Sequence, residues 1–315
     1  MKLLVTGGAG FIGSHVAETA LHLGYEVAVI DNLLTGRKEN VPAQAVFYQA
    51  DIRYKDQIDW IYREFQPEIV SHQAAQTSVS MSVRQPVLDA EINIIGSLNV
   101  LNACLAGNVK RLIFASTGGA IYGEIPPGKR ASVSWPAQPL SPYACSKLAI
   151  EGYLNCYHQQ QGLDFRILRY ANVYGPRQDP HGEAGVVAIF LDRLLAGQEI
   201  YVNAGRTVGD AGCIRDYVYV GDVVKANIAA IEDKINSPII NVGTGVETST
   251  LELAHLLEKS TDINARIEFN SFRPGDLVRS VLDASEYMAI MGTATDLNQG
   301  LKETVQWFRE QKSKY

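Results

Sequence analysis

The sequence predicts an α/β fold: a Rossmann-type, doubly wound parallel sheet with a smaller α/β C-terminal substrate lobe. Short, continuous Val/Ile/Leu runs alternate with helical stretches in the first half of the chain, as they do in parallel sheets buried on both faces. A glycine-rich turn separates the first run from the first helix, and an acidic residue ends the second run. After about residue 172, short helices, loops and isolated strands replace this alternation.

The elements of the first half can be placed in order. Strands are expected at residues 2–6, 26–30, 46–49, 69–72, 111–116 and 165–170. Helices are expected at residues 14–23, 56–64, 87–106 and 142–160. Because βαβ crossovers are right-handed, these helices should cover both faces of one sheet. We expect the first domain to span residues 1–172, with a returning segment near 214–235.

The remaining residues, 173–315, are expected to form the smaller lobe, packed on the carboxyl edge of the sheet. Its elements are expected at residues 186–195, 200–202, 217–220, 223–231, 239–242, 251–259, 265–269 and 304–311.

Composition excludes several classes of protein. The 315 residues are 46% hydrophobic and 20% charged, which argues against a disordered chain or a coiled coil. A net charge of −6 disfavours nucleic acid and anionic membranes as partners. We find no membrane-length apolar run and no signal peptide, so we expect a cytoplasmic protein. The four cysteines form no C-x-x-C pair, so neither a metal site nor a disulfide framework is expected.

The glycine-rich turn predicts a dinucleotide site. Gly7, Gly10 and Gly13 form G-x-x-G-x-x-G around Phe11 and Ile12. Such a turn lets backbone N–H groups and a helix N-terminus approach a pyrophosphate. The alternative is a glycine turn that only packs strand against helix.

An acid at the end of the second strand strengthens this prediction. Asp31 lies 18 residues beyond Gly13, where a carboxylate can bind the adenine ribose hydroxyls and would repel a 2′-phosphate. This favours NAD over NADP, although Arg37 and Lys38 lie nearby and could hold a phosphate.

A second motif suggests acid–base chemistry. Tyr143 and Lys147 are spaced i, i+4, so they share one face of a helix that can start at Ser141-Pro142. A nearby ammonium lowers a phenol's pKa, which would allow Tyr143 to act as a general base. Ser116 and Thr117 end a predicted strand at the sheet edge where ligands bind. A surface pair of Tyr and Lys is the alternative.

Together these motifs resemble the extended short-chain dehydrogenase/reductase family over almost the whole chain. Within it, the segments look most like UDP-glucose 4-epimerases of the compact prokaryotic type. The matching segments are residues 31–36, 51–53, 72–75, 116–123, 169–176, 215–217 and 273–276.

The resemblance implies interconversion of UDP-glucose and UDP-galactose through a 4-keto intermediate, by reversible hydride transfer to tightly bound NAD. Tyr143 would be the base, Lys147 its pKa-lowering partner, and Thr117 the hydroxyl that bridges Tyr143 and the sugar. One count along the loop places Gly118 at the hydroxyl position instead. We choose Thr117 because it carries a hydroxyl, with Ser116 in reserve.

The resemblance also implies the binding residues. Besides the glycine turn and Asp31, the cofactor would contact Asn32, Gly36, Asp51, Ile52, Ala74, Asn93, Tyr143, Lys147 and Tyr170. The UDP-sugar would contact Thr117, Tyr143, Asn172, Tyr201, Arg215, Arg273 and Asp276. Surface ion pairs are the alternative for the two arginines, and a core or surface aromatic for Tyr201. Relatives usually dimerise through two helices, here 87–106 and 142–160, so a homodimer is expected.

Some positions depart from the family pattern. Gln76-Thr77-Ser78 replaces a loop that carries Lys in the longer epimerases, and the loop 205–213 is longer than usual. Ser280 stands where a bulky aromatic would exclude N-acetylhexosamines, so UDP-GlcNAc and UDP-GalNAc are possible further substrates.

Three other functions compete with this reading. Dehydratases and decarboxylating relatives place acids where this chain has Gly118, Gly119 and Ala120, which disfavours both reactions. UDP-glucuronate 4-epimerisation, or action on another NDP-sugar, stays open. A non-catalytic dinucleotide-binding scaffold is the alternative from a different class, and such relatives usually lose the Tyr or the Lys.

Overall fold

The computed structural model describes residues 1–181, 185–273 and 275–312. Pro274, within the quoted segment 273–276, lies outside the described residues. The chain divides into two compact units. Unit 1 comprises residues 1–117, 141–169 and 223–240, and unit 2 comprises residues 118–140, 170–222 and 241–315.

A seven-stranded sheet forms the body of unit 1, with strand order β11-β6-β5-β4-β1-β2-β3. Its strands are β1 (Lys2–Thr6), β2 (Glu26–Asp31), β3 (Val46–Gln49), β4 (Ile69–His72), β5 (Arg111–Thr117), β6 (Asp164–Tyr170) and β11 (Ile239–Val242). The strand pairs from β3 across to β5 are parallel. This is the doubly wound order, which reverses between β1 and β4, where ligands bind in such sheets. The predicted fold class is confirmed.

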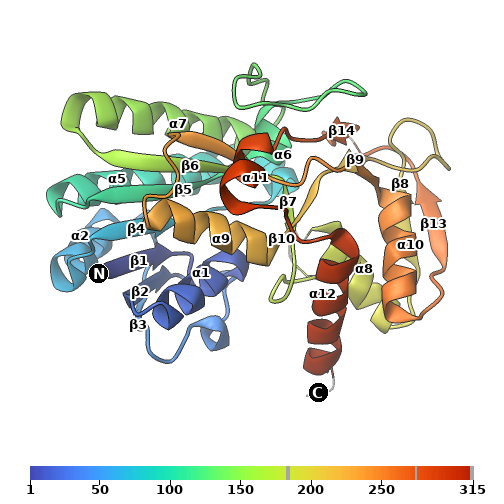
Figure 1. The fold of residues 1–315 in the computed structure, drawn as a ribbon, viewed down its shortest axis with the longest axis horizontal. Coiled ribbons are helices and arrows are strands. Elements are labelled where there is room, and N and C mark those ends of the chain that lie inside the picture. The colour runs from blue at the N-terminus through green and yellow to red at the C-terminus, as the bar shows by residue number, and fades with distance from the viewer. Residues whose placement is uncertain (182–184, 274, 313–315) are drawn as a thin grey trace. The chain divides into compact units, whose positions relative to one another are not determined.

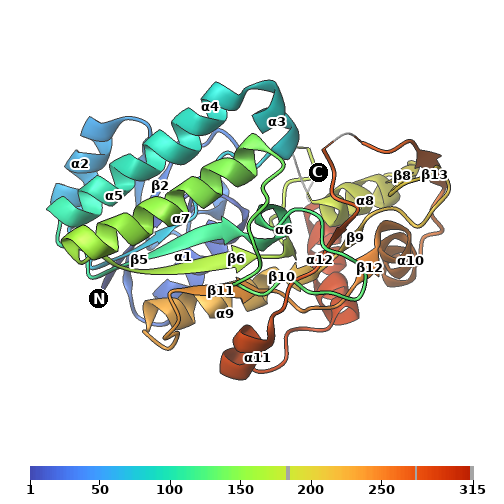
Figure 2. The same cartoon turned by 90° about the horizontal axis from the view of Figure 1, so that it is seen from above.

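Helices cover both faces of this sheet. On one face lie α2 (Lys55–Phe65), α5 (Ser97–Ala106) and α7 (Pro142–Gln161), and on the other lie α1 (Phe11–His22) and α9 (Val220–Ile231) (Figures 1 and 2). The first group shares one apolar core with the strands. Because both faces are covered, every residue of β4 and every residue of β1 except Lys2 is buried.

Residues 87–106 are helical as predicted, but they do not form one regular α-helix. The chain forms α3 (Val79–Arg84) and α4 (Pro86–Ala90), then a π-helical segment, η2 (Glu91–Gly96), before α5. A π-helical turn inserts an extra residue into a helix and is common at functional sites. Periodicity does not reveal it because the apolar positions continue on both sides.

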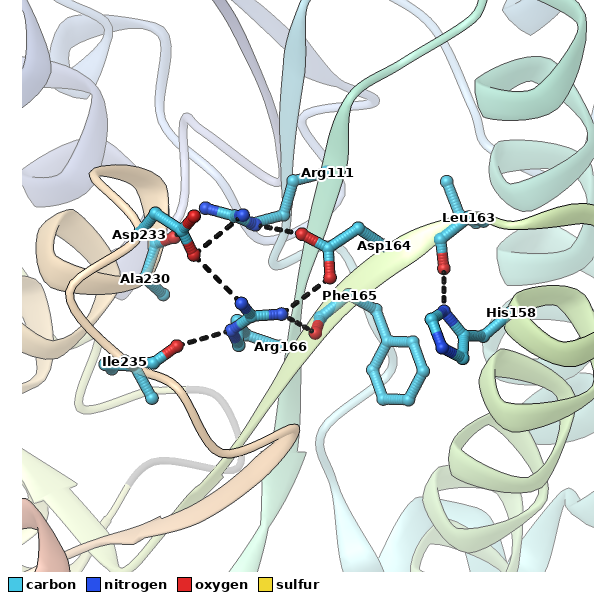
Figure 3. Close-up of polar contacts among 9 residues, drawn as sticks. All are labelled: Arg111, His158, Leu163, Asp164, Phe165, Arg166, Ala230, Asp233 and Ile235. Atoms are coloured by element: carbon cyan, nitrogen blue, oxygen red, sulfur yellow. Dashed lines mark hydrogen bonds and ion pairs between the residues drawn. The ribbon is translucent and has the colours of Figure 1, made fainter.

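An ion cluster ties the returning helix α9 to the amino ends of the strands in unit 1 (Figure 3). Arg111 and Arg166 both pair with Asp164, at 2.6 Å each, and both pair with Asp233, at 2.7 and 2.9 Å. Arg166 also donates a 2.6 Å hydrogen bond to the carbonyl of Ile235. This cluster lies at the edge of the sheet opposite the predicted site, so its role is structural.

Unit 2 is built from small sheets and helices. Its strands are β7 (Asn172–Tyr174), β8 (Ile200–Asn203), β9 (Ile214–Arg215), β10 (Tyr217–Tyr219), β12 (Thr248–Ser249), β13 (Ile267–Asn270) and β14 (Arg279–Ser280). Its helices are α6 (Gly118–Ile121), α8 (Val186–Leu195), α10 (Thr250–Thr261), α11 (Ser285–Met291) and α12 (Leu297–Lys312). Faces of α8, α10 and α12 form its apolar core with β8 and β10.

A short 3₁₀ helix, η1 (Lys38–Asn40), completes the elements. Sequence analysis missed it, together with α3, α6, α11 and the two- or three-residue strands β7, β9, β12 and β14. Elements this short span too few residues to show a period.

Candidate active site

The glycine turn lies between β1 and α1. Gly7 adopts φ +68°, and a Cβ there would lie 2.7 Å from the backbone nitrogen of Ala74. A Cβ on Gly13 would lie 2.2 Å from the carbonyl oxygen of Gly7. Gly10 caps α1 without a side-chain hydrogen bond, so the first-turn N–H groups of Phe11 and Ile12 remain at the open end of the helix. Only glycine fits this turn, and the turn suits a pyrophosphate.

Asp31 ends β2 beside this turn. Its carboxylate accepts hydrogen bonds from the backbone N–H of Ala9, at 3.0 Å, and of Leu33, at 2.8 Å. A Cβ on Gly36 would lie 2.7 Å from Asp31 Oδ1, so the loop closes tightly over the acid. Burial raises the pKa of Asp31, and the two backbone hydrogen bonds oppose this. The glycine turn and the oriented acid therefore fit a dinucleotide.

Of the two basic residues considered as phosphate ligands, Lys38 has its ammonium over the Phe47 ring, 3.2 Å from its centroid. Arg37 is held to the glycine turn by its backbone N–H, which donates to the carbonyl of Ala9 at 3.0 Å. The position of Asp31 favours NAD over NADP.

The residues expected near adenine form a small polar cluster. Asp51 accepts hydrogen bonds from the Arg53 guanidinium, at 3.0 and 2.8 Å, and from Asn32 Nδ2, at 3.0 Å. The Arg53 hydrogen bond is the main cause that lowers the pKa of Asp51 to about 2. Ile52 is buried, and a Cβ on Gly96 would lie 2.7 Å from its Cγ1. The Asp51 carboxylate is thus held in one orientation.

A directed chain of hydrogen bonds crosses the point where the strand order reverses. Ser97 Oγ donates to the carbonyl of Asn93 at 2.6 Å, so it must accept from His72 Nε2, 2.9 Å away. His72 Nδ1 then accepts from Thr6 Oγ1 at 2.6 Å, and Thr6 Oγ1 accepts from the Ala74 N–H at 3.2 Å. Burial, and secondarily Lys147, lowers the pKa of His72 to about 3, so the imidazole is neutral.

Asn93, expected to contact the cofactor, is already hydrogen-bonded within unit 1. Its side chain makes two 2.9 Å hydrogen bonds with the backbone of Gln76 and donates a third, at 3.0 Å, to Asp89. Both donor hydrogens are used, so only a lone pair of Oδ1 remains for a ligand. Asn93 therefore fixes the loop after β4.

The catalytic pair predicted from Y-x-x-x-K lies on the first two turns of α7. Ser141 caps this helix by accepting from the Ala144 N–H at 3.3 Å. Lys147 is buried, donates a 2.8 Å hydrogen bond to the carbonyl of Ala115, and places its ammonium 4.8 Å from the Phe114 ring centroid. Thr117, the last residue of β5, acts on the Tyr143 phenol and lowers its pKa. The three predicted catalytic residues therefore gather at the end of β5.

The protein's own groups raise the pKa of Tyr143 rather than lower it. Burial raises this pKa to about 12, against the effect of the Thr117 hydrogen bond, and Asp89 raises it further. Burial also lowers the pKa of Lys147 to about 8, while Asp89 and Glu151 oppose that shift. Among the protein's own groups, burial has the largest effect on the pKa of Tyr143.

Ser116, the reserve candidate for the bridging hydroxyl, has a different partner. Its Oγ donates a 2.6 Å hydrogen bond to Glu151, which is buried and also accepts two hydrogen bonds from the Arg169 guanidinium. Gly118, the position given by the second count, has no hydroxyl. Thr117 is therefore the hydroxyl directed to Tyr143.

Unit 2 contains the residues expected to bind UDP. Asn172 Nδ2 donates to the carbonyl of Asp216 at 3.2 Å. Arg215, the residue before Asp216, ends β9. The Asp216 carboxylate accepts from the backbone of Thr244 and Gly245, both at 2.9 Å, so the residues around Arg215 are fixed by a buried acid. Of the other expected UDP ligands, Tyr201 and Arg273 are exposed and Asp276 is half-buried.

Arg273 and Asp276 lie beside each other, with Nε and Oδ2 4.0 Å apart. Tyr201 on β8 is 36% exposed, its hydroxyl donates to Glu199 at 3.3 Å, and the Arg193 guanidinium lies 4.8 Å from its ring centroid. Tyr170 is buried at the end of β6. Arg273 and Tyr201 present surface that a ligand could cover.

Ser280, the position expected to control hexose size, is buried on β14. Its Oγ donates a 3.1 Å hydrogen bond to the carbonyl of Gly119, one of the small residues that replace acids in the dehydratases. The Glu124 carboxylate accepts from the backbone N–H groups of Val278, at 2.8 Å, and Arg279, at 2.9 Å. This strand and the loop 118–126 are therefore locked together within unit 2.

Sequence analysis missed two buried acids beside the catalytic pair. Glu151 lies one helical turn beyond Lys147, so its i+4 spacing could have indicated it. Asp89 gives no such signal, because its partners come from three separate segments. Among the described residues, no group of three or more His, Cys, Asp or Glu could hold a metal ion. Across the same residues, no helix is long and apolar enough to span a membrane.

Comparison with known proteins identifies the class that this fold and site define. Residues 3–243 match the model of the NAD dependent epimerase/dehydratase family, and the chain belongs to that family. UDP-glucose 4-epimerase of Mycolicibacterium smegmatis is 42% identical over 316 residues, which cover 98% of this chain and 99% of that protein.

Two solved structures match almost the whole chain. The UDP-glucose 4-epimerase of Thermus thermophilus, in complex with NAD, has a TM-score of 0.94 and 51% identity, covering 98% of this chain and 99% of that one. The UDP-glucose 4-epimerase of Thermotoga maritima, with UDP-glucose, has a TM-score of 0.93 and 44% identity, covering 99% of both chains.

Proposed function

We propose that the protein is a UDP-glucose 4-epimerase that interconverts UDP-glucose and UDP-galactose with tightly bound NAD. The observation that carries this proposal is the placement of the buried Lys147 one helical turn beyond Tyr143, with Thr117 acting on the Tyr143 phenol. A hydroxyl, a phenol and an ammonium in this arrangement suit reversible removal of a proton from a secondary alcohol. The full-length relatives described above are named UDP-glucose 4-epimerases.

Each catalytic residue has a distinct task in this proposal. Tyr143 takes the proton from the 4-hydroxyl of the hexose and later returns it. Thr117 orients the phenol and the sugar oxygen, and the Lys147 ammonium favours the phenolate form. The chemistry that NAD supplies when bound is reversible acceptance of a hydride from C4 of the hexose. The glycine turn, Asp31 and Asn32 would hold NAD through its pyrophosphate and ribose.

The same loop argues against elimination of a hydroxyl. The positions that follow Thr117 are Gly118, Gly119 and Ala120, so they offer no acid that could protonate a leaving group. In unit 2, Asn172, Arg215 and Arg273 would hold the diphosphate, because guanidinium groups match its oxygens. Asp276 would bind the uridine ribose, and Tyr201 would stack on uracil.

The proposal extends to the working form of the protein. We infer that the protein is a cytoplasmic homodimer. The dimer is supported by apolar side chains exposed along the α4–η2 and α7 surfaces of unit 1. These are Val87, Ile95 and Tyr153, which are 70%, 51% and 42% exposed. Sedimentation of the purified protein tests this part separately from activity.

The direct test is turnover of UDP-galactose by the purified protein without added NAD, followed with a coupled UDP-glucose dehydrogenase. We expect turnover, and we expect Tyr143→Phe to abolish it. Tyr153→Phe, an exposed tyrosine on the same helix, is the matched control and should keep the wild-type rate. Silence of the wild type with NAD also supplied would reject this sugar and direct the assay to UDP-glucuronate.

A second substrate class is favoured by Ser280. Its side chain is small and bonded to the carbonyl of Gly119, so this position carries no bulky group that would exclude an N-acetyl substituent. We propose that UDP-GlcNAc and UDP-GalNAc are also interconverted. Absence of UDP-GlcNAc turnover in a preparation that is active on UDP-galactose would reject this extension.

A further inference from the structure

Asp89 is a buried acid that no motif indicated. It lies on α4 with 1% of its surface exposed. Its Oδ1 accepts from Gln76 Nε2, at 2.7 Å, and from Asn93 Nδ2, at 3.0 Å. Its Oδ2 accepts from Ser146 Oγ at 2.6 Å. All three of these donors are neutral, so the hydrogen bonds hold the carboxylate without neutralising it.

These partners connect Asp89 directly to the catalytic helix. Ser146 lies between Tyr143 and Lys147 on α7, and α4 runs beside α7 (Figure 2). Gln76 and Asn93 belong to the loop after β4 and to the π-helical segment η2. One carboxylate therefore joins three segments of unit 1 that surround the catalytic pair.

The buried charges around Lys147 leave Asp89 as its counter-charge. Glu151 on α7 is also near Lys147, but it is paired with the Arg169 guanidinium of β6. His72 on β4 is neutral and offers no charge. The remaining titratable group on the same side is the Tyr143 phenol. Two cations and two carboxylates are thus buried together, and Glu151 is bonded to Arg169 whereas Asp89 is bonded to neutral donors.

We propose that Asp89 is a positioning residue that fixes the catalytic helix and provides the negative charge that keeps Lys147 protonated. The catalytic consequence rests on the function proposed above, whereas the effect on Lys147 does not. Asp89 touches neither substrate nor cofactor in this proposal and acts only through Ser146 and its electric field.

The sign of the effect follows from the charges. A nearby carboxylate favours an ammonium and disfavours a phenolate. Asp89 accordingly raises the pKa of Lys147 against the burial that lowers it to about 8, and it also raises the pKa of Tyr143. Removal of the charge should therefore move both titrations to lower pH.

Asp89→Asn is the sharpest variant because it changes charge while it preserves geometry. Its amide oxygen can still accept from Gln76 and Asn93, and its NH₂ group can donate to Ser146, whose hydroxyl rotates to accept. Asp89→Ser removes the same charge with different packing, and it replaces Asp89→Asn in the test if that variant does not fold. Ser146→Ala breaks a hydrogen bond of Asp89 but leaves the charge in place.

The first readout is the pH dependence of kcat for UDP-galactose. We expect Asp89→Asn and Asp89→Ser to shift both limbs of the profile to lower pH by roughly half to one unit. Ser146→Ala should not shift the limbs. Asp222→Asn is the matched control, since it removes another buried acid, one that accepts the Thr295 N–H at 2.7 Å in unit 2. Unmoved limbs in Asp89→Asn, or a shift to higher pH, would overturn the proposal.

The second readout needs neither substrate nor cofactor. If Lys147 loses its proton at lower pH in Asp89→Asn, this variant gains stability before the wild type does as pH rises. The deficit, which is the free energy of unfolding of the wild type minus that of the variant, should therefore narrow from about pH 7 to 9. Urea unfolding at several pH values measures that deficit, and the deficit of Asp222→Asn should stay constant. A constant deficit in Asp89→Asn would reject the proposal. Absent turnover in the wild type would instead reject only the function proposed above.

Discussion

The hydroxyl of Thr6 donates a 2.6 Å hydrogen bond to Nδ1 of His72, which joins the carboxyl ends of β1 and β4. The other imidazole nitrogen, Nε2, donates to Ser97 on α5 at 2.9 Å. In the neutral imidazole both ring nitrogens are therefore hydrogen-bonded, Nδ1 as acceptor and Nε2 as donor. A proton added to Nδ1 would require the Thr6 hydroxyl to stop donating to this nitrogen and to accept from it instead.

This arrangement predicts a loss of stability in mild acid. The pKa of His72 is lowered to about 3 by burial and by Lys147, whereas an unfolded histidine titrates near its ordinary value of about 6.5. The unfolded chain therefore binds a proton that the native chain does not, and stability falls as pH drops below that ordinary value. We expect this residue alone to cost about 2 kcal/mol between pH 7 and pH 5.

Urea unfolding at the two pH values measures this loss, and His72→Gln should remove about that amount of it. His158→Gln is the control, since His158 is exposed and bonds to the carbonyl of Leu163, at 3.0 Å, beside the Phe165 ring (Figure 3). The control should keep the wild-type loss. An equal pH effect in wild type and His72→Gln would show that other groups cause it.

The two hydroxyls that end β5 should have separable roles. Thr117 acts on the Tyr143 phenol, whereas Ser116 donates a hydrogen bond to the buried Glu151. We expect Thr117→Val to lower kcat for UDP-galactose roughly 100-fold with little loss of stability, because one transition-state hydrogen bond is removed. Ser116→Ala should instead cost roughly 1–3 kcal/mol of stability, because a buried carboxylate loses a donor. Steady-state kinetics and urea unfolding of both variants test this, and the reverse pattern would make Ser116 the bridging hydroxyl.

The sequence predicts the sheet because its signals are local. Strands such as β1 and β2 contain continuous aliphatic runs, and the turn at Gly7 requires glycine for steric reasons visible in the motif. The π-helical segment η2 could not be predicted, since its backbone change leaves the apolar pattern intact. Strands of two residues, such as β14, depend on pairing with distant segments rather than on their own sequence.

The residues of the site also differ in whether local sequence reveals them. Tyr143 and Lys147 are found from spacing, because one helix places them on the same face. Asp89 is not, because its three donors come from a loop, a π-helical segment and α7. The rise in the pKa of Tyr143 that burial causes could not be predicted either, since i+4 spacing carries no information about burial.

The buried pair of Glu151 and Arg169 gives a third prediction. Both side chains are at most 7% exposed, and the guanidinium donates two hydrogen bonds to the carboxylate. Arg169→Met should cost roughly 3–5 kcal/mol, because it leaves an uncompensated buried charge. The double variant Glu151→Gln/Arg169→Met should recover part of this loss. Urea unfolding at pH 7 measures both, and a single-variant cost below about 1 kcal/mol would contradict the prediction.

Ser280 offers the most direct test of substrate breadth. It is 2% exposed, its Oγ is bonded to the carbonyl of Gly119, and it pairs in register with Arg215 of the neighbouring strand β9. Ser280→Tyr places a ring where a small side chain now ends, so space for an N-acetyl group should be lost while UDP-galactose still fits. We expect the ratio of kcat/KM for UDP-GlcNAc to that for UDP-galactose to fall at least about tenfold. Ser280→Ala removes only the hydrogen bond to Gly119 and should keep the ratio. An unchanged ratio in an active Ser280→Tyr protein would show that this position does not limit the size of the hexose.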